Sequence, residues 1–358
     1  MTNPYPFSEA TVRPVETDDD KELEAFDNTK LVAINTCPTW GIIRYGLHKT
    51  LAGTGRAMAL EAGSAAHEVY AAVRLWQLRG EGLRSHFEFH GTRIFGSNRW
   101  DNLCSKIKDG TDENTNLLNF ALEALYSGEF YDDPNDRNRT VTNIEEGCIA
   151  YIDRYDWTRP VWVQDRENPE CRVGVENAFE LVIEFDGVPT MRFTGRIDGI
   201  HTQEVANRGN IIAKENKTGA RLDDAWLESF ILATQVTGYC VAASQFTGQP
   251  VTECCVIGQA IPIPKNVENG IRRNFVSRNE YDFERWFKWL WHTRELYLKY
   301  KDDPINAPQY THSCNRYFRL CSLMPFCYEE RDEKQEVLDR MIIDEWTPLE
   351  EGDPVRTA

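Results

Sequence analysis

The chain has 358 residues, of which 41% are hydrophobic and 27% charged, and its formal net charge is −17 at pH 7. Length and composition predict a globular protein of one to three domains with a large buried core. The acidic balance argues against a surface that neutralises nucleic-acid phosphates throughout, because non-specific affinity comes from Lys and Arg contacts.

The sequence also lacks the signals of a membrane or secreted protein. No apolar run reaches the ~18 residues of a membrane span, and the N-terminus lacks the basic-then-apolar layout of a signal peptide. We therefore expect a cytoplasmic protein without a membrane partner. In that reducing compartment the ten cysteines are expected to be core residues or ligands, and not a disulfide framework.

The N-terminal part is predicted to be a flexible acidic arm over residues 1–28, because it is polar and carries an acidic run. The chain then turns apolar, and Pro38 two residues after Thr36 favours a helix start there. A long helix is predicted over residues 55–79.

The next block, residues 84–160, contains a predicted short strand at His86–Ile94. Helices are predicted near 115–127 and 143–155, and together they form a helical insertion over about 96–158. Strands follow at 161–163 and 173–185.

Asp186-Gly187 then separates two strand-like runs, which is a hairpin signal. Two further strands, one through Asp198 and one through Glu215, are separated by a turn at 207–209. A helix is predicted over 223–245, a strand over 251–263 and an aromatic helix over 281–301. The C-terminal part holds a cysteine-bearing segment over 302–345 and an acidic tail over 346–358.

This order predicts an α/β fold with a mixed central sheet flanked by helices. Residues 56–301 form the expected core. Residues 29–55 and 302–345 form a second, cysteine-bearing subdomain.

The segment from Phe193 to Tyr239 carries the residues that point to chemistry. Its first strand contains Gly-Arg-Ile-Asp198, and its second contains Glu215-Asn-Lys217, whose two charged side chains share one face of an extended chain. Neighbouring strands can bring Asp198, Glu215 and Lys217 to one point, where the carboxylates would seat a divalent cation. The alternative is ordinary surface charge on a sheet.

These motifs, followed by Gln235-x-x-x-Tyr239, resemble the PD-(D/E)XK nuclease superfamily, and in particular its RecB-like exonuclease branch. The resemblance implies a restriction-endonuclease-like core and metal-assisted hydrolysis of phosphodiester bonds. It also implies that Lys217 orients the attacking water or stabilises developing charge, and that Gln235 and Tyr239 meet the nucleic-acid strand. Without the family, these two would be packing and capping residues.

His67 lies four residues after Gly63 on the long predicted helix, and hence on the same face. A lone helical histidine is usually a surface or core residue. In the RecB-like branch, however, a Gly-x-x-x-His helix precedes the Asp strand, and its imidazole joins the metal shell. The resemblance thus implies that Mg²⁺ or Mn²⁺ is held by His67, Asp198, Glu215 and the backbone carbonyl of Asn216. Glu176 is a weaker candidate for a further acidic contributor.

Three late cysteines, Cys314, Cys321 and Cys327, are spaced too widely for a zinc knuckle. With Cys37, in a Cys-Pro sequence, they resemble the cysteines of the iron–sulfur nucleases of this superfamily, namely the AddB nuclease domain and the CRISPR-associated RecB-like exonucleases. That resemblance implies a 4Fe–4S cluster on these four thiolates. The spacing departs from the family's usual Cys-x₂-Cys-x₅-Cys, and the alternative is a set of buried core cysteines.

The sequence therefore predicts a metal-dependent DNA exonuclease acting on DNA ends, which we expect to be single-stranded. Such proteins serve recombination, repair or phage and CRISPR DNA processing in bacteria and their viruses, and protein partners in a recombination or adaptation complex are expected. Two alternatives stay open: a DNA-end-binding or scaffold subunit with a vestigial site, and an endonuclease of the same superfamily.

Overall fold

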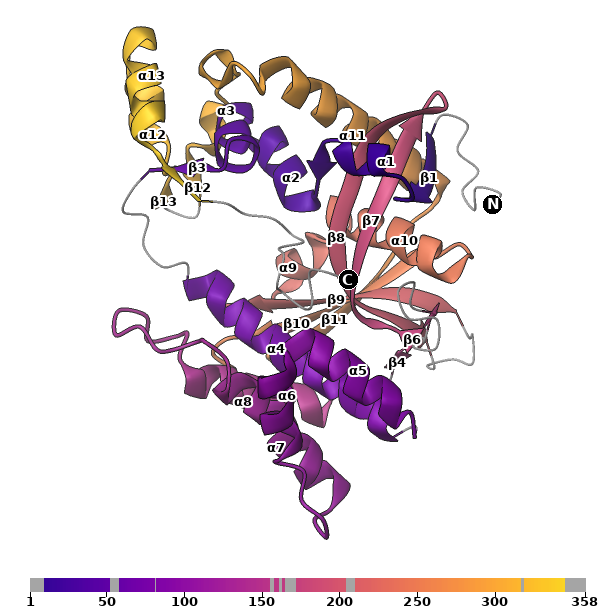
Figure 1. The fold of residues 1–358 in the computed structure, drawn as a ribbon. Helices are drawn as coiled ribbons and strands as arrows, with labels where there is room; N and C mark the ends of the chain where they lie inside the picture. The colour runs from indigo at the N-terminus through magenta and orange to yellow at the C-terminus, as the bar shows by residue number, and fades with distance from the viewer. Residues whose placement is uncertain are drawn as a thin grey trace.

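The computed structural model describes residues 10–51, 58–80, 82–154, 158–160, 163–164, 172–203, 210–316 and 319–344. A mixed, mostly antiparallel central sheet is flanked by helices on both faces (Figure 1). This confirms the predicted fold class at the level of a mixed central sheet between helices. None of the helices in the described ranges has both the length and the apolar character needed to cross a membrane.

The sheet runs in the order β1-β7-β8-β9-β10-β11, and β2 and β4 also pair with the long strand β8. Neighbouring strands are antiparallel, except that β9 pairs with β10 and β2 with β8 in parallel. The bounds are β1 Ala10–Pro14, β2 Ala25–Phe26, β4 Thr158–Pro160, β7 Val175–Phe185, β8 Val188–Gln203, β9 Ile211–Gly219, β10 Glu253–Ala260 and β11 Ile271–Ser277.

The hairpin predicted at Asp186-Gly187 is present between β7 and β8. Both turn residues have positive φ, 53° and 74°, which a tight hairpin requires and which Asp and Gly tolerate. Two residues from the turn, a β-bulge between Ile183 and Glu184 shifts the pairing by one residue. The bulge therefore sets which side chains face each other further along these strands.

One face of the sheet packs against α2 (Asn28–Thr36), α10 (Thr234–Thr247) and α11 (Glu280–Tyr300). In α11 the buried residues Phe283, Trp286, Phe287 and Leu290 recur at helical spacing, so this aromatic helix is amphipathic as expected. Asn279 and Asp282 form a capping box at its start.

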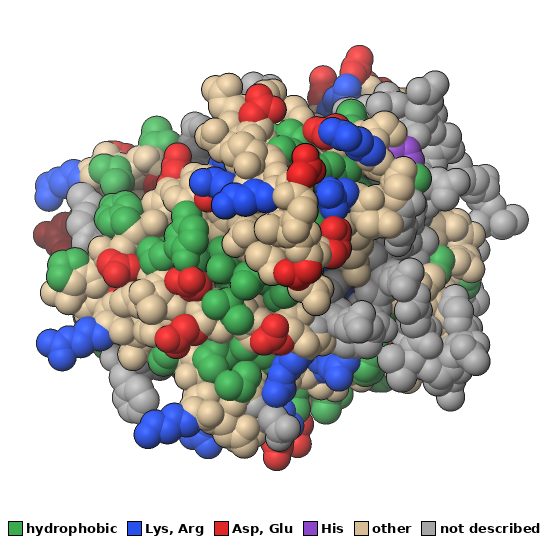
Figure 2. Space-filling view, turned by 90° about the horizontal axis from the view of Figure 1, so that it is seen from below, with side chains coloured by type: hydrophobic (Ala, Val, Ile, Leu, Met, Phe, Trp, Pro, Cys, Tyr) green, Lys and Arg blue, Asp and Glu red, His purple; other side chains and the backbone are tan. Residues whose placement is uncertain are grey.

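The other face carries a layer of five helices, which Figure 1 shows below the sheet. They are α4 (Met58–Gly80), α5 (Arg84–Phe95), α6 (Ser97–Cys104), α7 (Glu113–Tyr126) and α8 (Val141–Asp153). Seen from that side, acidic, basic and hydrophobic side chains are interspersed over the surface (Figure 2). Adjacent Cys254 and Cys255 contribute to the cores on opposite sides of the sheet.

Three sequence predictions are corrected here. Residues 86–94, predicted as a strand, lie in α5, because Phe87, His90 and Gly91 are buried together on one helix face. The helix predicted over 223–245 is two helices, α9 (Asp224–Glu228) and α10, interrupted at residues 229–233.

The prediction of a flexible arm over residues 1–28 is wrong for its second half, which forms regular structure. Residues 10–14 pair with β7 as strand β1, and α1 (Asp18–Glu22) follows. Asp20 is buried and accepts two hydrogen bonds from the Arg13 guanidinium, at 2.6 and 2.7 Å. The acidic run is thus anchored by its one buried member. Residues 1–9 and the turn expected at 207–209 lie outside the described residues.

A smaller core joins residues from both ends of the chain: Ile43, Leu323, Phe326, Leu338 and Met341. It is built from α3 (Pro38–Gly41), a π-helical turn η1 (Ile42–Gly46), α12 (Met324–Tyr328) and α13 (Arg331–Arg340), with the strand pair β3 (Lys49–Thr50) and β14 (Ile342–Ile343). The remaining elements are short: β5 Val163–Gln164, β6 Arg172–Val173, η2 Val267–Asn269, η3 Pro304–Asn306, η4 Thr311–Ser313, β12 Asn315–Arg316 and β13 Arg319–Leu320.

Candidate functional site

Three strands bring acidic side chains into one row across the sheet. Val175 pairs with Gly199 and Asn177 with Ile197, so Glu176 of β7 lies opposite Asp198 of β8. On the other side, the β8–β9 pairing ends at Gly199 and Lys214, one residue before Asp198 and Glu215. The three carboxylates are 6%, 7% and 2% exposed, respectively. Burial of like charges at this density is costly unless cations or hydrogen bonds compensate.

Asp198 is held by the neighbouring strand. Its Oδ2 accepts the backbone N–H of Asn216 at 2.6 Å and the Asn216 side-chain amide at 3.2 Å. Two donors on one oxygen fix the orientation of the carboxylate, which a metal ligand requires.

His67 approaches the same oxygen from α4. Its Nδ1 lies 3.6 Å from Asp198 Oδ2, and the helix comes close because Gly63 has no side chain: a Cβ there would sit 3.2 Å from Thr218 Oγ1. Burial lowers the pKa of His67, although Asp198 opposes the shift. A neutral imidazole is the form that binds a metal ion.

The ligand atoms of His67, Glu176 and Asp198 all lie within 4.8 Å of one another. One imidazole nitrogen and two carboxylates at that spacing can hold a hard divalent cation such as Mg²⁺ or Mn²⁺. Glu176 also forms an ion pair with Arg196, at 3.1 Å, and has a positive φ of 49°. Such a backbone is uncommon for glutamate and concentrates at functional sites.

Of the predicted ligand set, the structure brings His67 and Asp198 together, while Glu215 lies beside them and forms an ion pair with Lys217. Glu176, a weak candidate in the sequence, completes the three-residue group in place of Glu215. Asn216 is close through its amide groups, and a hydrogen bond with its backbone is a minor influence that opposes the lowering of the His67 pKa by burial.

Glu215 and Lys217 form the second half of the site. The pKa of Glu215 is raised to about 8, first by burial and then by the charge of Asp198. The interactions with Lys217 and with the Tyr239 hydroxyl oppose this shift. Burial is the largest single influence on the pKa of Lys217 and lowers it, but the interactions with Glu215 and Asp198 act in the other direction and the net shift is upward. Glu215 Oε2 is buried and has no hydrogen-bond partner among the residues that the structure describes, which leaves a lone pair available to a cation.

Gln235 and Tyr239 contact each other on α10, as their spacing predicts: the Gln235 amide donates to the Tyr239 hydroxyl at 2.8 Å. Tyr239 is 8% exposed and lies against Glu215. The pair therefore borders the acidic row. Contact with nucleic acid stays a prediction.

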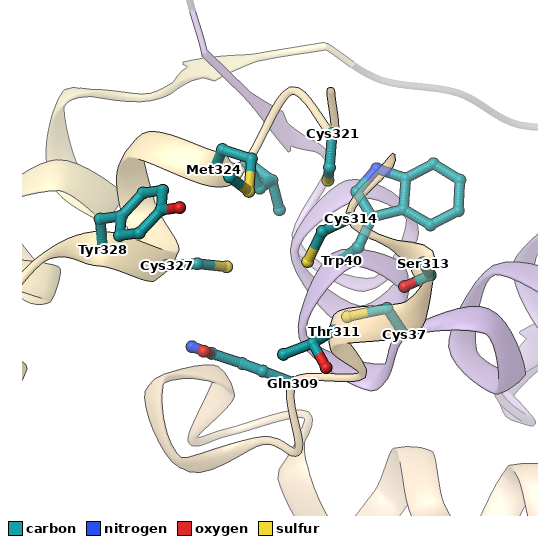
Figure 3. Close-up of a pocket in the computed structure, with 11 residues that line it drawn as sticks. Cys37, Trp40, Gln309, Thr311, Ser313, Cys314, Cys321, Met324, Cys327 and Tyr328 are labelled. Carbon is teal, nitrogen blue, oxygen red and sulfur yellow. The ribbon is translucent and has the colours of Figure 1, made fainter. Parts of the chain in front are cut away.

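The four predicted cluster cysteines line one cavity of about 240 Å³ (Figure 3). Cys37 comes from the start of α3, and the other three, Cys314, Cys321 and Cys327, come from the C-terminal segment. Trp40, Met324 and Tyr328 complete much of its wall. Figure 3 shows thiols from both chain segments bordering one space.

The thiols influence one another electrostatically. Burial raises the pKa of Cys327 to about 11, and Cys37, Cys321 and Cys314 add to the shift. Of the other cysteines, Cys148, Cys240, Cys254 and Cys255 are buried and Cys104 is partly buried, as expected of core or surface thiols. Cys171 lies outside the described residues.

Glu176 is the site residue that sequence reasoning undervalued. If the pairing set by the two-residue turn at Asp186-Gly187 continued without interruption, Glu176 would lie opposite Ile197. Its side chain would then point to the face of the sheet opposite that of Asp198. The bulge at Ile183 and Glu184 shifts the register by one. A bulge has no reliable signature in a single sequence. The sequence could therefore offer Glu176 as a candidate, but counting residues from the hairpin turn could not predict that it lies opposite Asp198.

The sequence matches no protein-family model and no curated protein.

Proposed function

We propose that this protein is a divalent-metal-dependent DNA exonuclease of the RecB-like type, which hydrolyses phosphodiester bonds at DNA ends, with single-stranded ends as the expected substrate. The observation that carries the proposal is the convergence of the ligand atoms of His67, Glu176 and Asp198 within 4.8 Å, next to the ion pair between buried Glu215 and half-buried Lys217. The resemblance of the motifs to that nuclease branch supplies the reaction class.

His67, Asp198 and Glu176, with Glu215 and the Asn216 carbonyl, would hold Mg²⁺ or Mn²⁺. When bound, the ion supplies a water of lowered pKa and neutralises charge on the phosphate. The protein's own groups prepare the ligands: Asn216 fixes the orientation of the Asp198 carboxylate, and burial lowers the pKa of His67, which favours its neutral imidazole.

Lys217 would orient the attacking water or stabilise charge that develops on the phosphate oxygens. Its side chain is 33% exposed, and its ammonium is already close to the acidic row through the ion pair with Glu215. Gln235 and Tyr239 border the same region from α10, where they would meet the DNA strand. These placements support the roles that the resemblance implies.

We further propose that Cys37, Cys314, Cys321 and Cys327 hold a 4Fe–4S cluster. The donor set fits, because four thiols from two distant segments line one cavity and iron–sulfur clusters are held by four thiolates. The cluster would connect the two ends of the chain, with no redox role required. Purified protein that is colourless and free of iron would contradict this part of the proposal.

The activity is tested by digestion of end-labelled single-stranded DNA with Mn²⁺ or Mg²⁺, with and without a chelator. We expect metal-dependent shortening by the wild type, no shortening by Asp198→Asn, and roughly 10²-fold slower turnover by Lys217→Ala, the scale of losing one preorganised donor. Lys265→Ala, which removes an exposed lysine from a segment outside the three strands of the acidic row, is the control and is expected to keep full activity.

Three other results distinguish the alternatives. DNA that is retarded in a gel but never shortened indicates an end-binding or scaffold protein. Cleavage of closed circular DNA indicates an endonuclease. Near-normal digestion by Lys217→Ala removes that residue from its proposed role.

A further inference from the structure

A buried chain of polar side chains runs from the helical layer to Asp198. It starts at Arg74 on α4, two turns beyond His67, where the guanidinium donates to the Tyr151 hydroxyl of α8 at 2.6 Å. Tyr151 in turn donates to Asn216 Oδ1 at 3.1 Å. The Asn216 amide nitrogen then donates to Asp198 Oδ2 at 3.2 Å.

The direction of each hydrogen bond is fixed by the one before it. Arg74 can only donate, so the Tyr151 oxygen accepts and its proton points to the next group. That proton requires the carbonyl side of Asn216, which turns the Asn216 NH₂ toward Asp198. Hydrogen bonds that run in one direction also polarise one another in a low-dielectric interior.

The whole chain is shielded from water. Arg74, Tyr151 and Asn216 are 1–2% exposed, and α8 carries none of the candidate metal ligands. Burying a guanidinium and a phenol hydroxyl costs free energy. Here the hydrogen-bond chain that they form ends on the Asp198 carboxylate, at the centre of the acidic row.

We propose that Tyr151 and Arg74 are positioning residues of the metal centre, which set the orientation of Asn216 and through it the Asp198 carboxylate. The helical layer is thereby part of the site. This inference rests on the proposed function, because it assigns the relay to a bound divalent cation.

The fold offers a closely matched control in Tyr70. Its ring lies 4.3 Å from that of Tyr151, it is equally buried at 1% exposed, and its hydroxyl donates to Gln259 at 2.6 Å. Tyr70→Phe therefore removes a buried hydrogen bond of the same kind from the same core, but outside the relay.

The test is calorimetric titration of Mn²⁺ into the purified full chain, with far-UV circular dichroism and thermal melting as fold checks. We expect Tyr151→Phe to bind Mn²⁺ about 10-fold more weakly, the lower end for a lost outer-shell partner, and Tyr70→Phe to bind as the wild type does. Both variants should melt at similar temperatures. If Tyr151→Phe does not fold, Arg74→Lys is used, and the same loss is expected because a lysine cannot reproduce the planar donor geometry.

A double-mutant cycle sharpens the test. If Tyr151 acts through Asn216, Tyr151→Phe should cost almost no further affinity in an Asn216→Ala background. Additive losses, or wild-type Mn²⁺ affinity in Tyr151→Phe, overturn the relay. Asp198→Asn separates the two proposals: if that variant loses Mn²⁺ binding while Tyr151→Phe keeps it, only the relay fails. If the wild type shows no Asp198-dependent binding, the proposed function fails and the relay with it.

Discussion

At the scale of single residues, the position of Glu176 shows what a one-residue shift of register does to a site. The register shift at Ile183 and Glu184 places Glu176 opposite Asp198, and Glu176 itself has a positive φ of 49°. A strained backbone of this kind costs on the order of 1–3 kcal/mol. We infer that the strain is retained because the carboxylate is needed beside Asp198.

Glu176→Gln is therefore expected to weaken Mn²⁺ binding by at least about 10-fold and to slow DNA digestion, because a ligand charge is lost. The control is Glu180→Gln on the same strand, whose carboxylate instead pairs with Arg192 at 3.2 Å and lies outside the acidic row. Calorimetry and end-labelled digestion measure both effects. Equal Mn²⁺ affinity in the two variants would remove Glu176 from the site.

Lys214 is a second residue whose burial has a measurable consequence. It is fully buried on β9, and burial lowers its pKa to about 7 from 10.5, with Cys255 opposing and Arg273 adding to the shift. Between these two pH values the unfolded state binds the proton and the folded state does not. The free energy of unfolding therefore rises with pH across that window.

We predict that Lys214→Met is more stable than the wild type below pH 7, and that its advantage shrinks as the pH rises from 7 toward 10.5. The difference between the two proteins isolates Lys214 from other groups that titrate in the same range. Urea unfolding across the pH range gives both stability curves. Parallel curves would contradict the assignment of the lowered pKa.

At the scale of elements, the sequence predicted the features with strong local signals. The long helix α4, the Asp186-Gly187 hairpin, the aromatic helix α11 and the helices α7 and α8 all lie close to their predicted positions. The secondary-structure predictions that were wrong lie where tertiary contacts determine the local conformation. Residues 86–94 alternate like a strand, yet the burial of Phe87 and Gly91 against Trp100 makes them a helix.

The sequence could predict most residues of the candidate site, but not how their side chains are arranged in space. Spacing within β9 linked Glu215 to Lys217, and motif order linked His67 to Asp198. The relay through Tyr151 and the ligand position of Glu176 had no such signal, because both depend on packing between layers and on a register shift.

The junction of α2 and α3 carries Cys37 and depends on Gly41. A side chain at Gly41 would collide with the backbone of Ile34 in α2, which cannot rotate away as a side chain can. The two helices can meet at this angle only with glycine there, and that approach sets the direction of Cys37.

Gly41→Ala is therefore predicted to lower the free energy of unfolding by about 1–3 kcal/mol, the usual range for overpacking, and to reduce iron content. Gly80→Ala is the matched control, because nothing lies within 4 Å of a Cβ at the end of α4. That substitution should be neutral or stabilising by up to about 1 kcal/mol. Urea unfolding and iron analysis measure both variants, and a Gly41→Ala protein as stable as the wild type would refute the close-contact argument.

At the scale of the whole molecule, the small core under the cysteine cavity joins residues from both ends of the chain. A cluster bound there contributes its ligation free energy to folding. The main sheet and its two flanking cores are built largely from other residues. If both proposals hold, the iron–sulfur cluster and the divalent-metal site lie in separate regions of the molecule.

Cys327→Ser is predicted to lose iron and to melt at a lower temperature, while its far-UV circular dichroism and Mn²⁺ affinity stay near those of the wild type. Cys104→Ser is the control, since Cys104 is partly buried on α6, away from the cavity. Visible absorbance, iron analysis and calorimetry measure these effects. Full iron content in Cys327→Ser would exclude it as a ligand.

The cavity also has a consequence for how the protein is made. Cys37 leaves the ribosome about 280 residues before Cys314, so at roughly 5–20 residues per second tens of seconds pass before the other cysteines of the cavity are synthesised. Helices α2 and α3 likewise form their contacts with α11 and with the helices that follow it only after those later segments have been synthesised. Helices α2 and α3 are therefore made early but reach their final place late.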